Sequence, residues 1–243
     1  IAALEHLKAD RDLKCVVIAG EGPSWCAGVE VADHRPEQVD AMIATFNRML
    51  ELIEGQEVPT IAAVHGACLG GGMEAAIAGD IVVAGKSAVF GQPEIKLGFF
   101  PPYAAIRLPQ LVGPAKAIEI CTTGKRYLAQ DAKEMGFVNY CVEDGQLPQT
   151  VDGLVKEIAT SSPLIIRLNK QAVKRHLGMP FPAALEGVDE PVEPVDDARA
   201  GAVVHVARLL VLVNDPAAAL DEQKPLQVFL LQLDAQCAQR HHA

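Results

Sequence analysis

Three consecutive glycines, Gly70, Gly71 and Gly72, constrain the fold of this 243-residue chain more than any other feature. They stand between an apolar run at 60–64, with Thr, Ile and Val among its residues, and a helix-like run at 73–78. Glycine lets the backbone turn sharply and brings its amides close to a ligand, and the first N–H groups of a helix have no partner inside it. The sequence therefore predicts a strand, a tight loop and a helix whose N-terminus offers hydrogen-bond donors.

Two glutamates accompany these glycines. Glu74 follows Gly72 by two residues, and Glu94 lies further along in the run Gln92-Pro93-Glu94. Each has apolar neighbours, and an unneeded charge is costly in such surroundings. Taken separately, the glycines can be a simple turn, Glu74 a first-turn residue favoured by the helix dipole and Glu94 a surface residue. Taken together, donors for a developing oxyanion and two carboxylates able to share one water indicate an enzyme acting on an activated carbonyl compound.

Other common functional motifs are missing from the sequence. No Lys-Ser or Lys-Thr follows Gly72 and no Gly-x-Gly-x-x-Gly run opens a helix, which argues against nucleotide binding through either motif. No serine stands in a Gly-x-Ser-x-Gly elbow, which argues against a serine hydrolase. The six cysteines form no Cys-x-x-Cys pair and the histidines no zinc-ligand spacing, so we expect reduced thiols, no metal and a structural role for His65 beside the glycines.

The charge and hydropathy of the chain limit its partners. A formal net charge of −10 argues against a broad surface for nucleic acid or anionic membranes. The sequence contains no long uninterrupted apolar span and no stretch with the pattern of a secretory signal. We therefore expect a cytoplasmic protein without a nucleic-acid or membrane partner.

The hydrophobic pattern alternates short strands with helices, which is typical of an α/β fold with parallel pairing. The expected strands are at 14–19, 60–64, 81–84 and 88–90. The expected helices are at 38–54, 72–78, 114–122, 129–135 and 149–161, with further helix-like runs at 198–213 and 226–238. An acidic, proline-bearing segment at 190–197 reads as a linker. We accordingly divide the chain into a core at 1–178 and a C-terminal helical capping and oligomerisation region at 179–243.

The residues from 59 to 98 closely resemble the enoyl-CoA hydratase/isomerase (crotonase) family. The resemblance is carried by Pro-Thr-Ile-Ala-Ala-Val-His-Gly at 59–66, by the loop at 69–74, by Gly-Asp-Ile at 79–81 and by Phe-Gly-Gln-Pro-Glu at 90–94. It extends upstream to residue 16 and downstream to residue 174, and so covers roughly the first three quarters of the chain. It implies a spiral of repeated β-β-α turns with a C-terminal helical region that caps the active site and builds trimers.

The same resemblance implies a site and a reaction. In the family, the amides at the positions of Ala27 and Gly71 form an oxyanion hole for an acyl-CoA thioester. The positions of Glu74 and Glu94 are the acid/base pair of the hydratases. The resemblance thus implies a homotrimeric or hexameric hydratase that adds water across the α,β double bond of an acyl-CoA, with coenzyme A as part of the substrate and no cofactor or metal. The sequence does not decide which glutamate is the acid.

A local departure from the family bears on the acyl group. Where hydratases of linear chains usually continue with glycines, this chain reads Phe99-Phe100-Pro101-Pro102-Tyr103. Proline fixes φ and aromatic rings fill space, so these residues predict a stiffer and flatter pocket wall, unless they reflect simple drift in a packed loop. With residues 33–38, they resemble the branch of the family that hydrates cyclohexa-1,5-diene-1-carbonyl-CoA.

Three alternatives and two further departures remain open. An isomerase or a carbon–carbon hydrolase would use the same oxyanion hole, although many isomerases keep only one of the two glutamates. A non-catalytic binding protein is opposed by the acidic balance and by the intact glutamate pair. The tail after residue 178 lacks the family's usual closing pattern. Residues 1–7 match the middle of a family helix, so we expect an opening strand pair to be absent from this sequence.

Overall fold

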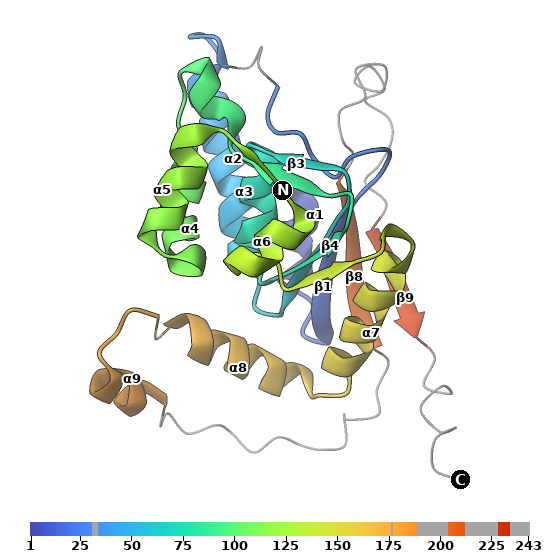
Figure 1. Ribbon diagram of the computed structural model, residues 1–243. Helices are drawn as coiled ribbons and strands as arrows, with labels where there is room; N and C mark the ends of the chain where they lie inside the picture. The colour runs from blue at the N-terminus through green and yellow to red at the C-terminus, as the bar shows by residue number, and fades with distance from the viewer. Residues whose placement is uncertain (31–33, 176, 189–203, 212–227, 234–243) are drawn as a thin grey trace.

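Two β-sheets form the centre of the protein, and helices surround them (Figure 1). The computed structural model describes residues 1–30, 34–175, 177–188, 204–211 and 228–233. The larger sheet has the order β7-β4-β2-β1-β8-β9 and the smaller the order β3-β5-β6. The larger sheet comprises β1 (Leu13–Gly20), β2 (Thr60–Val64), β4 (Ile81–Gly85), β7 (Tyr140–Val142), β8 (Val204–Val211) and β9 (Val228–Leu233). The smaller sheet comprises β3 (Ala67–Leu69), β5 (Val89–Gly91) and β6 (Arg126–Leu128).

The chain winds through both sheets in repeated turns. Strand β2 belongs to the larger sheet, β3 follows it in the smaller one, and α3 (Gly71–Ala78) then closes the turn. Strands β4 and β5 repeat this path and lead into the short 3-10 helix η2 (Pro93–Leu97) and α4 (Pro102–Val112). Pairing between β2 and β4, and between β3 and β5, is parallel. The predicted α/β class and the spiral of β-β-α turns are confirmed.

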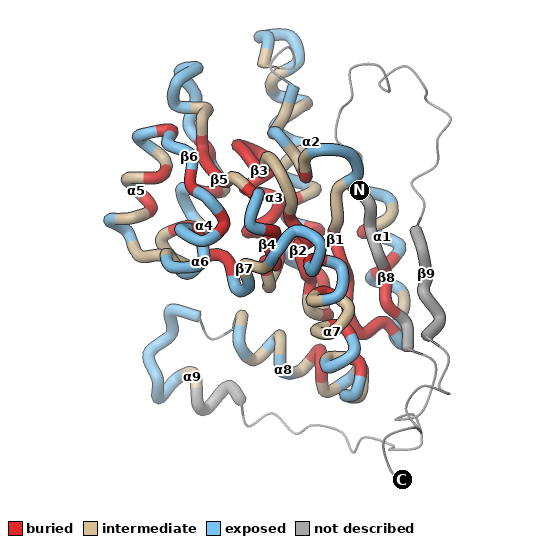
Figure 2. Tube along the Cα trace, turned by 45° about the vertical axis from the view of Figure 1, so that its right-hand side comes forward, coloured by how far each residue is buried: buried red, intermediate tan, exposed pale blue. Residues whose placement is uncertain are grey.

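Strand β1 is buried on both faces, which explains its nearly continuous apolar sequence. Val16 and Ile18 point into the main core, while Cys15 and Val17 point to a second cluster on the opposite face. Helix α7 (Leu147–Ala159) covers that opposite face with Leu147, Val151 and Val155, at helical spacing. Figure 2 shows the buried residues concentrated along the central strands and α3.

Most of the predicted helices are present. Besides α3 and α7, the predicted helices that are present are α2 (Val39–Glu54), α5 (Pro114–Thr123) and α6 (Ala129–Met135). The structure adds helices that the hydrophobic pattern did not predict: α1 (Ala2–Leu7), the 3-10 helix η3 (Asp144–Gln146), α8 (Pro163–Arg175) and α9 (Phe181–Val188). Helix α4 was not predicted, because residues 101–103 read as a stiff loop. Pro102 instead starts the helix, since proline at the first helical position loses no hydrogen bond. No helix among the described residues is long and apolar enough to cross a membrane.

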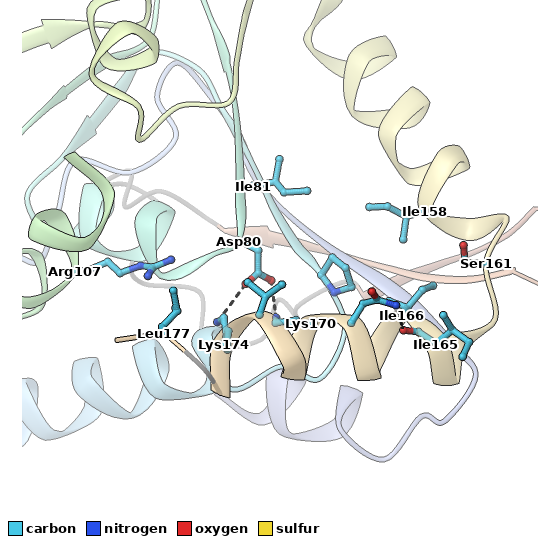
Figure 3. A pocket seen from close by; sticks show the side chains of 13 residues that line it. Asp80, Ile81, Arg107, Ile158, Ser161, Ile165, Ile166, Lys170, Lys174 and Leu177 are labelled. Carbon is cyan, nitrogen blue, oxygen red and sulfur yellow. Dashed lines mark hydrogen bonds and ion pairs between the residues drawn. The ribbon is translucent and has the colours of Figure 1, made fainter. Parts of the chain in front are cut away.

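Helix α8 is attached to the core by partly buried charges (Figure 3). Lys170 and Lys174 both form ion pairs with Asp80, which follows α3 in the chain. Lys170 Nζ also donates to the Val58 carbonyl oxygen at 2.8 Å. Burial acts in the opposite direction, but the two lysine charges hold the pKa of Asp80 below its usual value. The helix is thus positioned by electrostatics as well as by its apolar face.

The two helix-like runs of the tail are a wrong prediction within the described residues. Residues 204–211 and 228–233 form strands β8 and β9, and the other residues of those runs lie outside the described part. β8 pairs in parallel with β1, with Ile18 opposite Leu209, and β9 pairs antiparallel with β8. Valines favour an extended backbone, and the edge of β1 provides backbone groups with which β8 can form hydrogen bonds. The periodicity of the local sequence gives no information about that distant pairing. Among the described residues beyond 178, α9 is helical, whereas α8 precedes the predicted boundary at 178/179. That boundary stays a prediction.

Candidate active site

The three glycines form the turn between β3 and α3. Gly70 has a φ of +55°, a conformation that side chains with a Cβ rarely adopt. Its N–H donates to the Gly91 carbonyl oxygen at 2.9 Å, and a Cβ on Gly70 would overlap the Glu94 carboxylate. Gly71 is the first residue of α3, so its N–H has no partner within the helix. The predicted loop and donor-bearing helix start are confirmed.

The segment containing Ala27 runs beside this turn. Cys26 and Cys68 form a parallel β-bridge, and the Leu69 N–H donates to the Cys26 carbonyl oxygen at 3.0 Å. A Cβ built on Gly28 would lie 3.5 Å from the Gly71 nitrogen. The backbone on either side of Ala27 is therefore in contact with the glycine turn. The two residues predicted to supply oxyanion donors lie on adjacent segments.

Glu74 is buried in the first turn of α3, with 3% of its surface exposed. Its Oε1 accepts the N–H of Ala104 at 2.9 Å, at the start of α4. Burial raises the pKa of Glu74 to about 7, against the opposing effect of the Ala104 and Tyr103 amides, and the charge of Glu94 raises it further. A carboxyl group with this pKa exists in both protonation states near neutral pH.

Glu94 lies on η2, across from the glycine turn. Its backbone carbonyl accepts the Phe99 N–H at 3.1 Å, which closes the turn after η2. Burial raises the pKa of the Glu94 carboxyl, while its own amide, the charge of His34 and the Gly71 amide act in the opposite direction. Its Oε2 is buried and has no hydrogen-bond partner among the described residues. Glu94 is thus a second carboxyl group with a perturbed pKa.

All nine predicted site residues line one cavity of about 460 Å³. They are Ala27, Gly71, Glu74, Glu94, Phe99, Phe100, Pro101, Pro102 and Tyr103. Sequence reasoning missed the opposite wall, which α2 provides through Val39, Met42, Ile43, Phe46 and Asn47. The apolar stripe of α2 indicated a packed face and gave no sign that part of it borders a cavity. His34 also lines the cavity and was missed as a site residue.

A second cavity of about 470 Å³ lies elsewhere, between α8 and the core (Figure 3). Its walls are mostly aliphatic, with the Asp80 ion pairs along one side. It contains none of the predicted site residues. The cavity beside α2 is therefore the one of the two that brings the predicted glutamates and the glycine turn together.

The fold and the site together define a protein of the crotonase type. A solved structure of enoyl-CoA hydratase from Bacillus anthracis is similar, with a TM-score of 0.73 and 30% sequence identity over 76% of this chain and 74% of that one. The family model for enoyl-CoA hydratase/isomerase matches residues 1–191. The chain belongs to the enoyl-CoA hydratase/isomerase family.

Named relatives agree with this assignment. A probable mitochondrial enoyl-CoA hydratase 2 of Arabidopsis thaliana is 33% identical over 189 residues, which are 76% of this chain and 63% of the relative. A cyclohexa-1,5-dienecarbonyl-CoA hydratase of Thauera aromatica is 36% identical over 140 residues, 58% of this chain and 54% of the relative. The matched region thus spans less than two thirds of the length of either relative.

Proposed function

We propose that this protein hydrates enoyl-CoA thioesters, adding water across the α,β double bond. The observation that carries the proposal is the shared cavity: Glu74, Glu94 and the N-terminus of α3 face the same space. Two carboxyl groups with raised pKa values beside the amides at the start of α3 suit proton transfer next to a developing enolate. Membership of the enoyl-CoA hydratase/isomerase family supports the same reaction.

The oxyanion donors of the proposal are the Ala27 and Gly71 amides. The thioester carbonyl oxygen accepts both hydrogen bonds, which strengthen as negative charge develops on it. Each donor of this kind typically contributes about 3 kcal/mol to the transition state. The position of Gly71 at the start of α3 adds the helix dipole to this stabilisation.

Glu74 and Glu94 move the protons. A water held between them gives its hydroxyl to the β-carbon and one proton to an ionised glutamate, while the other glutamate supplies a proton to the α-carbon. After the reaction, the glutamate that was ionised is protonated and the other glutamate is ionised. Transfer of one proton between the two carboxyl groups restores their starting states. General acid–base assistance of this type contributes roughly 10²–10⁴-fold. Because the pair shares one water, it titrates as a unit, and the proposal assigns neither role to a particular residue.

For the acyl group we propose a cyclic dienoyl substrate. Phe99 and Phe100 stand at the mouth of the cavity, and the ring of Phe46 on α2 faces the glycine turn from the other wall. Flat rings suit stacking against a flat acyl group. The relative from Thauera aromatica is named for a substrate of this shape, which supports the choice.

Further parts of the proposal concern cofactors, assembly and location. The reaction as written requires no metal and no cofactor beyond the coenzyme A of the substrate. We also propose a homotrimer or hexamer, because apolar side chains such as Ile106, Ile118 and Phe181 are exposed in the single chain. A cytoplasmic location is a separate part of the proposal. Light scattering that reports a monomer at micromolar concentration would remove the oligomer from the proposal.

The rival reactions differ in the products they predict. An isomerase would move the double bond without a change of mass, and a carbon–carbon hydrolase would split the acyl chain. Two carboxyl groups on one cavity favour hydration, since a double-bond shift can proceed with one. Purified protein incubated with linear and cyclic enoyl-CoA thioesters should give products heavier by one water. The Glu74→Gln and Glu94→Gln proteins serve as matched controls, and an unchanged mass with a shifted double bond would replace hydration by isomerisation.

A further inference from the structure

His34 is held at the wall of the active-site cavity by two contacts. Its Nδ1 lies 3.2 Å from the Glu30 carbonyl oxygen, and because a carbonyl only accepts, Nδ1 carries the proton in this geometry. Its ring packs on Phe99, with centroids 4.7 Å apart and planes inclined at 44°. With Nδ1 donating to the carbonyl, Nε2 is the second ring nitrogen of the imidazole.

The contact with Phe99 connects His34 to Glu94. The Phe99 N–H donates to the Glu94 backbone carbonyl, so the ring that supports His34 belongs to the turn that carries the carboxylate. Both His34 and Glu94 line the cavity. The imidazole is thereby fixed relative to the carboxylate by backbone geometry on one side and by ring packing on the other.

In the described part of the chain, the titratable groups around Glu94 other than His34 do not carry a positive charge that could stabilise its carboxylate. Titratable side chains from two other elements face Glu94: Glu74 on α3, which repels it, and Cys121 on α5, whose pKa is raised by burial and by both carboxylates. The residues following His34, Arg35 and Glu37, are exposed. Among the described residues that act on Glu94, His34 is the one able to carry a positive charge.

We propose that His34 is a positioning residue whose imidazolium keeps the Glu94 carboxylate ionised and fixed beside the glycine turn. This proposal rests on the proposed hydratase function. It adds to the two glutamates a third side chain, which positions one of them. A half-buried carboxylate with one buried, unpartnered oxygen is costly, and a cation nearby offsets part of that cost. His34 therefore adjusts the fraction of Glu94 that is ionised.

The test is a direct titration of Glu94, which does not depend on turnover. The infrared band of the protonated Glu94 carboxyl is identified by its loss in Glu94→Gln. It is followed against pH in proteins that all carry Glu74→Gln, so that Glu94 does not titrate together with Glu74. In His34→Gln the midpoint should rise by about half a unit to one unit, because removing a positive neighbour disfavours the carboxylate. In His34→Lys it should return toward the value measured with His34, since the charge is restored without the imidazole.

The matched control is His65→Gln. His65 also bonds a carbonyl, that of Gly22, at 3.0 Å, but it does not line the cavity. Its replacement should leave the Glu94 midpoint unchanged. An unchanged midpoint in His34→Gln, or an equal rise in His65→Gln, would overturn the proposal. If the wild-type protein hydrated no enoyl-CoA, the proposed function would fail while the titration still decided the role of His34.

Discussion

The Glu94 carboxylate lies directly against Gly70, where there is no room for a Cβ. This contact joins the glycine turn to the second carboxylate of the site, although the two residues are 24 positions apart in the chain. The glycine therefore serves two purposes: it adopts a positive φ, and it leaves space for the Glu94 carboxylate.

Replacing Gly70 by alanine should consequently damage both stability and activity. The positive φ and the overlap with Glu94 should lower the free energy of unfolding by about 1–3 kcal/mol, and the displaced carboxylate should reduce hydration. Urea unfolding and enoyl-CoA turnover measure the two effects. Gly145→Ala is the matched control, because Gly145 has open space where a Cβ would stand. Equal stability of the two variants would contradict the contact.

Replacing either glutamate by glutamine should abolish most of the activity. Glutamine keeps the shape of the side chain but cannot exchange a proton, so kcat for hydration should fall by at least about 10²-fold while acyl-CoA still binds. Steady-state kinetics and calorimetric binding of a product thioester provide the measurements. Near wild-type turnover in Glu74→Gln or Glu94→Gln would exclude the two-glutamate mechanism.

The buried Glu74 should make stability depend on pH. Burial is the main reason why its pKa is about 7, above the ordinary value of 4.5, so the folded state binds more protons than the unfolded state between these values. This contribution to stability is therefore fully present below about pH 4.5 and is lost as the pH rises through 7. Glu74→Gln should be more stable than the wild type at pH 8, by about 3 kcal/mol at most, and the gain should vanish near pH 4.5. Denaturant titrations at both pH values test this, and a gain that did not change with pH would contradict it.

The aromatic wall should select for ring-shaped acyl groups. The unmodified protein should hydrate a cyclic dienoyl-CoA with a higher kcat/KM than a ten-carbon linear enoyl-CoA, by about 10-fold or more. Phe99→Ala should reduce this preference, because it opens the wall without touching the helix that begins at Pro102. Competition between the two thioesters measures the ratio. Equal turnover of the linear substrate would remove the cyclic assignment and leave the hydratase proposal in place.

The ion pairs beneath α8 should be important for stability. Asp80→Asn leaves the partly buried Lys170 and Lys174 without their carboxylate, which should cost about 2 kcal/mol of unfolding free energy. Lys86→Gln breaks the exposed pair with Glu143 and should cost less than about 1 kcal/mol. Urea unfolding compares the two variants. A similar small loss in both would show that the partly buried pairs do not hold the helix.

Local patterns explain which parts of the fold were predictable. Strands β1, β2 and β4 are buried apolar runs, and the glycine turn with α3 has its own chemistry, so each could be read from neighbouring residues. Strands β8 and β9 could not, because β8 is stabilised by pairing with β1, almost 200 positions earlier. Their alternation of apolar and polar residues is too weak to exclude a helix.

The candidate site also has parts that were predictable from local sequence and parts that were not. The two glutamates and the two donor positions stand in recognisable motifs, whereas the α2 wall and His34 enter the cavity through contacts between distant segments. The rings of His34 and Phe99 are in contact although the two residues are 65 positions apart, and neither local sequence predicts that contact. The first residues of α4 were predicted as a wall, but their backbone amides were not predicted to bind Glu74.

That binding of Glu74 to the backbone of α4 has a consequence for how the protein can diversify. An amide N–H is present at position 104 whatever side chain stands there, unless it is proline. Side-chain substitutions along residues 99–104 can therefore reshape the cavity wall during evolution while the amide that holds the Glu74 carboxylate is kept. The shape of the cavity, which depends on side chains, can in this way change independently of the position of Glu74, which depends on the main chain.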